Sequence, residues 1–153
     1  HGVEGLCIEN GFLVLTGEMI IAKNDKRYSP VAVYSMADKK MKSTLLELTT
    51  ERGKISAADC LIDKVSGKFT LYAIERHYGI ASILKMVIDP DELASIIVPQ
   101  VLLDVSSMFK GTKLPNFEGV IIEQDKHKTD DIFLINDNQY RGIDGPNRLW
   151  HIF

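Results

Sequence analysis

Short apolar runs near the start of the chain alternate with turn-forming residues. Residues 6–9 and 12–15 flank Asn10-Gly11, a dipeptide that readily supplies the two positive φ angles of a tight hairpin turn. Further strand-like runs cover residues 19–22, 31–36 and, with a short helix as the alternative, 43–50. The first third of the chain is therefore predicted to consist mainly of strands.

A second hairpin is predicted farther along the chain. Residues 58–62 and 69–74 are strand-like, and the polar segment between them contains Asp63 and Gly67, which fit a turn of about four residues. After this hairpin the apolar spacing changes. A stripe at helical period predicts a helix over residues 75–88, and it consists of Tyr78, Ala81, Ile83, Leu84 and Val87.

Residues 89–109 have the features of a capped helical segment. Asp89 is a suitable N-cap, Pro90 suits the first helical position, and Glu92 completes a capping pattern. Apolar residues then recur at helical spacing, and Pro99 is expected to kink the segment into a helix pair. Ile96 and Leu103 fall on the face that should be wet, so either a second layer or a partner must cover them.

Strands are predicted again after Pro115. The run Val120-Ile121-Ile122 indicates burial on both faces, which places residues 117–123 centrally in a sheet. Residues 132–135 and 148–153 are further strand candidates. The order of strands, helices and strands predicts an α+β fold: a mixed, mainly antiparallel sheet packed on a central helical block of about residues 76–109. The sequence has no evident internal repeat.

The length of 153 residues, with 45% hydrophobic and 25% charged residues, predicts a single domain over residues 1–153. His1 stands in place of an initiator Met, which indicates processing, excision from a longer chain or a cloning remnant. There is no run of about 18 apolar residues and no leader pattern, so we expect a soluble, cytoplasmic protein. Cys7 and Cys60 lie in apolar runs and are expected to be buried free thiols.

A net charge of -3 and a pI near 5.8 argue against dominant nonspecific DNA binding. Lysines nevertheless crowd the first third of the chain, and Lys39, Lys40 and Lys42 are the candidates for a nucleic-acid contact. The favoured interpretation is that they protect strand edges from aggregation.

The remaining candidate chemistry is that of a small metal-independent nuclease or nucleotide-processing enzyme. Imidazole, guanidinium and phenol groups can act as acid, base and phosphate clamp. The residues of these types are His77, His127, Tyr140, Arg141, Arg148 and His151. An enzyme would require them to converge on one pocket.

No motif for a phosphate cradle, a zinc helix or a calcium loop occurs, so neither a cofactor nor a metal ion is expected. Without a catalytic signature, the leading hypothesis is a noncatalytic protein-interaction or accessory module. Its partner would be another protein or a second copy of the chain, bound through Ile96 and Leu103, without membrane contact. The enzyme and a nucleic-acid-binding module remain the alternatives.

Overall fold

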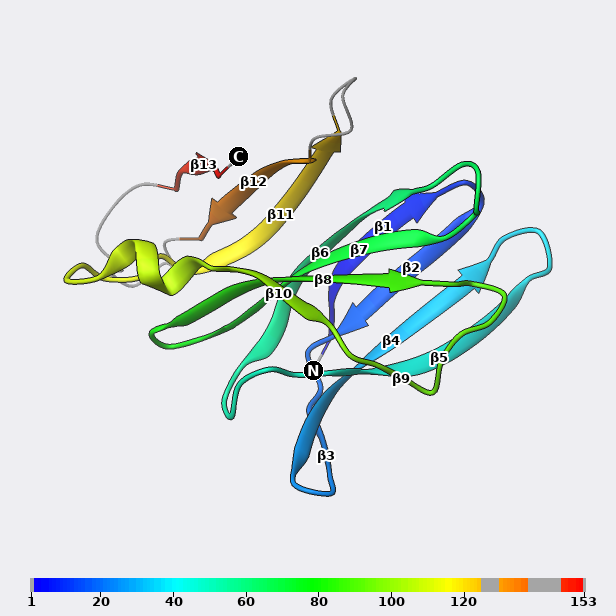
Figure 1. Ribbon diagram of the computed structural model, residues 1–153, viewed down its shortest axis with the longest axis horizontal. Helices are drawn as coiled ribbons and strands as arrows, with labels where there is room; N and C mark the ends of the chain where they lie inside the picture. Colours follow the sequence, from blue (N-terminus) through cyan, green and yellow to red (C-terminus); the bar gives the residue numbers. More distant parts are fainter. Residues whose placement is uncertain (1, 125–129, 138–146, 153) are drawn as a thin grey trace.

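The computed structural model describes residues 2–124, 130–137 and 147–152, and within them the chain is built almost entirely of β-strands. The strands form three mainly antiparallel sheets, here called sheets A, B and C, which follow one another along the chain (Figure 1). The only helical element among the described residues is a short 3₁₀ helix, η1 (Val105–Phe109). The prediction of an α+β fold with a central helical block is therefore wrong.

Sheet A is formed by the first five strands and by one short strand from a later segment. Its order is β1-β2-β4-β5-β9, and β3 pairs with the beginning of β4. Asn10 and Gly11 both have positive φ and form the predicted turn between β1 and β2, which confirms the first hairpin. The strands are β1 (Val3–Glu9), β2 (Phe12–Gly17), β3 (Ile21–Lys23), β4 (Lys26–Ser35), β5 (Lys40–Glu47) and β9 (Ile96–Ile97).

Sheet B is a four-stranded meander in the order β10-β8-β7-β6. The second predicted hairpin is confirmed: β6 and β7 pair in register, and the amide of Asp63 donates to the carbonyl of Lys68 at 2.9 Å across their turn. The strands are β6 (Lys54–Ile62), β7 (Phe69–His77), β8 (Ile80–Ile88) and β10 (Gln100–Asp104).

Sheet C contains β11 (Phe117–Gln124), β12 (Asp130–Asn136) and β13 (Leu149–His151), in that order. β11 lies at one end of this order rather than centrally. Val120 and Ile122 are buried on one of its faces, whereas Ile121 on the other is 52% exposed. The prediction that residues 117–123 are central and buried on both faces is therefore wrong among the described residues.

Sheet B lies between the other two sheets and is covered on both faces. A core that includes Val14 and Leu46 of sheet A packs on one face, and a core that includes Phe117 and Leu134 of sheet C packs on the other. Consecutive residues along β7 and β8 are consequently buried. The predicted helix over residues 75–88 is therefore wrong. A run of consecutive apolar residues fits a helical stripe as readily as a strand that is buried on both faces, so the sequence pattern does not distinguish the two.

The predicted helix pair over residues 89–109 is also wrong, although its capping signal corresponds to real contacts. Asp89 Oδ1 accepts hydrogen bonds from the amides of Asp91 at 3.0 Å and Glu92 at 3.2 Å, as an N-cap would. The chain then extends instead of coiling. It crosses to the edge of sheet A as β9, in register with Leu45 and Leu46, and returns to sheet B as β10.

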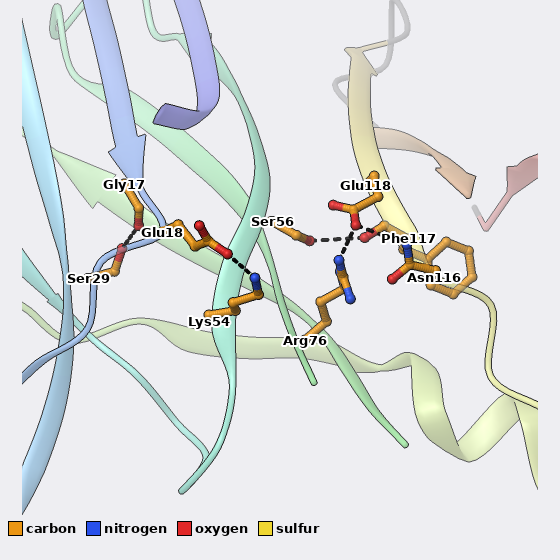
Figure 2. Close-up of polar contacts among 9 residues, drawn as sticks. All are labelled: Gly17, Glu18, Ser29, Lys54, Ser56, Arg76, Asn116, Phe117 and Glu118. Atoms are coloured by element: carbon orange, nitrogen blue, oxygen red, sulfur yellow. Dashed lines mark hydrogen bonds and ion pairs between the residues drawn. The ribbon is translucent and has the colours of Figure 1, made fainter. Parts of the chain in front are cut away.

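The first strands of the three sheets lie next to one another, with β6 in contact with both β1 and β11. Gly5 permits the close approach of β1, because a Cβ there would come within 2.6 Å of the Cβ of Ala58. On the other side, Ser56 Oγ donates to the carbonyl of Phe117 at 3.0 Å, and Arg76 pairs with Glu118 (Figure 2). Each sheet therefore begins beside the first strand of the next sheet.

Cys7 and Cys60 form a disulfide between β1 and β6, with their Cα atoms 5.8 Å apart. The expectation of free thiols is thus wrong. Both cysteines are buried as predicted, but an apolar sequence context favours burial without revealing a partner 53 residues away. The bridge fastens sheet A to sheet B at their first strands.

The three sheets repeat one unit, an antiparallel meander that runs outward from its first strand. No repeat is evident in the sequence because each strand needs only a pattern of apolar positions, which different residues satisfy. The repeat is therefore structural.

Candidate interaction surface

The face of sheet A directed away from sheet B is covered with apolar side chains. Paired residues in a sheet lie on the same face, so the strand registers define the set. Its apolar side chains are Leu6, Ile8, Leu13, Leu15, Ala32, Tyr34, Met41, Leu45 and Ile96, and the registers add Pro30, paired with Leu45, and the polar Ser43, paired with Ala32. We call this surface the outer face of sheet A.

The outer face of sheet A has a continuous row of cross-strand partners. Ile8 pairs with Leu13, Leu13 with Tyr34, and Tyr34 with Met41. The two ends of the row are open to solvent, with Ile8 60% and Met41 66% exposed. Alternate residues of the same strands are buried against sheet B. Sheet A is thus apolar on both faces, and the described chain covers only one of them.

An uncovered apolar sheet face indicates an interaction site. Soluble monomers rarely expose large contiguous apolar patches, because burying each Leu or Ile side chain contributes about 1.5–3 kcal/mol. Isolated exposed apolar residues are normal and would indicate nothing. What distinguishes this face is that exposed and half-buried apolar residues adjoin one another across four neighbouring strands.

The two predicted partner-binding residues lie in different places. Ile96 is in register with Leu45 on the outer face of sheet A and is 39% exposed. Leu103 belongs to β10 and packs partly buried against the core between sheets B and C. Only Ile96 therefore belongs to the candidate surface, while this chain's own sheets largely cover Leu103.

The predicted nucleic-acid-binding lysines lie at the turn between β4 and β5. Lys39 has a positive φ in this turn, and Lys40 is exposed at the first position of β5. Lys42 Nζ donates to the carbonyls of Pro90 at 2.8 Å and Asp91 at 2.9 Å. Lys42 thus holds the segment that leads to β9, so it is the least available of the three for a phosphate.

The described nuclease candidates are not gathered in one place. His77 lines a cleft of about 490 Å³ at the end of β7, together with Arg76 and Asn116, and this cleft includes neither Arg148 nor His151. His151 stacks on Phe133 with ring centroids 4.7 Å apart, on sheet C. Arg148 lies over the ring of Trp150 at 6.0 Å. His127, Tyr140 and Arg141 lie outside the described residues.

A polar cluster at the junction of sheets B and C has no counterpart in the sequence predictions. Tyr72 donates to Asp130, Lys85 Nζ lies 3.0 Å from Asp130 Oδ2, and Gln124 Nε2 donates to Asp130 Oδ1 at 2.8 Å. Burial raises the pKa of the Tyr72 phenol, and its hydrogen bond to Asp130 acts in the same direction. No motif signals this cluster, because its members are far apart in the chain.

The cluster makes stability depend on pH. Burial alone would raise the pKa of Asp130, but the hydrogen bonds from Tyr72, Gln124 and Lys85 outweigh it, so that the pKa lies below its ordinary value of 3.8. A carboxyl with a lowered folded-state pKa stabilises the fold above its unfolded-state pKa and loses this contribution as the pH falls. Asp130→Asn should therefore lower the free energy of unfolding by about 1 kcal/mol at neutral pH.

This difference should shrink as the pH falls below about 4, where the wild-type carboxyl also becomes neutral. Urea unfolding at several pH values measures it, with Glu123→Gln, an exposed carboxylate of β11, as the matched control. If the difference in unfolding free energy stays constant from neutral to acid pH, the charge of Asp130 does not contribute to the stability of the fold.

Among the described residues, no helix has the length and apolar character needed to cross a bilayer. Comparison of the chain with models of known protein families finds no match, and comparisons with curated proteins and with solved structures also find none.

Proposed function

We propose that this chain is a noncatalytic protein-interaction module that self-associates through the outer face of sheet A. The observation that carries the proposal is the in-register apolar row from Ile8 to Met41, which lies opposite a fully packed core. Its chemistry suits a protein partner: aromatic residues and Met are enriched at the centres of protein interfaces. Tyr34 and Met41 are adjacent on this face.

The alternative functions have less support. A nuclease needs an acid, a base and a phosphate clamp around one pocket, and the described candidates lie on separate elements. Nucleic-acid binding needs free cations, whereas Lys42 donates to two backbone carbonyls. Both stay predictions without a specific observation in their favour.

The disulfide bears on where such a module works. Disulfides persist in oxidising compartments and are rare in the cytosol, where thiols are kept reduced. We therefore propose an oxidising compartment for the chain, in place of the cytoplasm expected from its sequence. Alkylation of free thiols in the natural protein tests this point, because a Cys7–Cys60 bridge leaves both sulfurs unmodified.

Charged substitutions on the outer face of sheet A test self-association. The double variant Ile8→Glu, Met41→Glu should sediment as a monomer, whereas the wild-type chain should show a larger mass that rises with concentration. Charges at both exposed ends of the apolar row should weaken association by at least about thirtyfold. Both side chains are more than half exposed in the single chain, so the substitutions should change the unfolding free energy little.

The matched control is Val65→Glu, which places the same charge at a residue that is 96% exposed in the hairpin loop between β6 and β7. This variant should associate like the wild type. A wild-type chain that is monomeric at every concentration, or an outer-face variant that keeps the wild-type mass, would contradict the proposed function.

A further inference from the structure

The packing of the three sheets has a direction. Sheet A uses one face against sheet B, and sheet B uses its opposite face against sheet C. In each sheet the first strand lies beside the first strand of the next one, and the other strands follow outward in order. We call the face of a sheet that packs on the next sheet in the chain its forward face, and the opposite face its backward face. At both described junctions, the forward face of one sheet packs on the backward face of the next.

This direction leaves two unlike end faces. One is the outer face of sheet A. The other is the face of sheet C directed away from sheet B, which we call the outer face of sheet C. Its registers pair Ile121 with Phe133, and Ile135 with Leu149. Three of these four side chains are exposed, and Phe133 is half-buried. The apolar run of β11 predicted burial on both faces, and the residues that the structure describes cover only one of them.

Each end face is the counterpart of a face that the chain itself covers with another of its sheets. The outer face of sheet C corresponds to the face of sheet A that receives sheet B. The outer face of sheet A corresponds to the face of sheet B that receives sheet A. What fits each end is therefore a sheet of the same construction, with the same direction of packing.

We infer that the outer face of sheet C of one copy packs on the outer face of sheet A of a second copy, and that the reciprocal contact closes a two-chain ring of six sheets. This inference rests on the proposed self-association and specifies its geometry. Contacts between unlike faces form rings when the rotation closes and filaments when it does not. Rings of about four to eight four-stranded sheets around a central axis are the β-propeller architecture, and six falls within that range.

The internal junctions indicate what such a contact contains. Beyond the apolar faces, polar contacts join sheet B to the first strand of sheet C, from Ser56 of β6 to Phe117 and from Arg76 of β7 to Glu118 (Figure 2). Glu18, which follows β2, pairs in the same way with Lys54 at the start of β6. In the closed ring, β11 of one copy would lie beside β1 of the other.

A mixing experiment tests the pairing of unlike faces. One variant carries Ile8→Glu and Met41→Glu on sheet A, and the other carries Ile121→Lys and Ile135→Lys on sheet C. Each variant alone should self-associate at least about thirtyfold more weakly than the wild type, because both sheet contacts of its ring are altered. An equimolar mixture should recover the mass of two chains. In the mixed pair, the unaltered sheet C of the first variant meets the unaltered sheet A of the second. At the other contact, the Glu side chains on sheet A meet the Lys side chains on sheet C.

Contrary outcomes separate this inference from the proposed function. If the sheet C variant associates like the wild type while the sheet A variant does not, two like faces meet, and only the inferred geometry is wrong. A mixture that stays monomeric also overturns the geometry, and wild-type masses that grow beyond two chains overturn closure of the ring. A monomeric wild type overturns both proposals.

Photocrosslinking provides a second measurement that does not depend on the folding of charged variants. A benzoylphenylalanine introduced at Leu149, on the third strand of sheet C, should crosslink in an isotopically labelled chain to residues 12–35 of an unlabelled chain, which include the second and third strands of its sheet A. Leu149 is exposed on the outer face of sheet C, so the probe should leave the core intact. Crosslinks to sheet C of the unlabelled chain instead would overturn the pairing of unlike faces.

Discussion

Replacing both Cys7 and Cys60 with alanine should lower the free energy of unfolding by about 4 kcal/mol. The bridge closes a loop with a sequence separation of 53, and the chain-entropy estimate for a loop of this length is about 4 kcal/mol. The free energy of unfolding of a typical domain is only about 5–15 kcal/mol, so this loss is a large fraction of it. Urea unfolding of the wild-type and double-alanine chains measures the difference.

The natural control is the wild-type chain with and without a reductant, which removes the bridge while keeping both side chains. Reduced wild type and the double-alanine variant should then unfold at similar urea concentrations. Both sulfurs are buried in the core between sheets A and B, so the substitution also removes some packing. A double-alanine variant within about 1 kcal/mol of the oxidised chain would contradict the role assigned to the disulfide.

The second large effect is expected at Glu75, whose side chain is fully buried at the end of sheet B. Its two oxygens accept the backbone amides of Thr49 at 2.8 Å and Thr50 at 3.0 Å, together with both threonine hydroxyls. These bonds hold the connection from β5 to β6. Glu75→Ala would leave these donors without their acceptor, which should cost about 3 kcal/mol of unfolding free energy.

Glu51→Ala is the matched control, because Glu51 is an exposed carboxylate in the same connection and its loss should change stability by less than about 0.5 kcal/mol. Glu75→Gln distinguishes the loss of hydrogen-bond acceptors from the loss of side-chain volume, because Gln has nearly the same shape as Glu. The amide keeps one oxygen, but its NH2 group faces a donor, so most of the loss should persist. If Glu75→Ala unfolds with the same midpoint as the Glu51 variant, the four hydrogen bonds do not stabilise the connection.

Much of the strand content could be predicted from local patterns. Asn10-Gly11 supplies the φ angles of a tight turn without help from tertiary structure, and the segment from Asp63 to Gly67 does the same for the second hairpin. Ile132 and Leu134 alternate with less buried neighbours in β12, as a strand covered on one face requires. These signals depend only on neighbouring residues.

The helices were predicted wrongly because their signals depend on context. Ile83 and Leu84 are both buried since sheet B is covered on two sides, and a sequence pattern does not distinguish two covered faces from one helical stripe. Asp89 has the hydrogen bonds of a cap, but its segment gains more by pairing with β5. Tertiary contacts thus outweighed local propensity.

One residue of the candidate surface, Ile96, is also among the residues selected from the sequence. Ile96 was selected as an apolar residue on a wet helical face, and it lies on the outer face of sheet A for a different reason. The other members of that face are in strands whose alternation was visible, but which of the two faces lies against sheet B depends on sheet packing. The Cys7–Cys60 bridge was missed for the same reason.

The position of β9 has a consequence for how the molecule loses its structure. The last strand of sheet A comes from residues between two strands of sheet B, and Lys42 and Thr44 anchor it through bonds to the backbone of the preceding segment. In arrays of stacked repeats, neighbouring units can open one at a time. Because β9 of sheet A is joined in the chain to β8 and β10 of sheet B, neither sheet can open without disturbing the other, and we expect them to form one cooperative unit. Sheet C, which contributes no strand to either, can open locally at lower free energy.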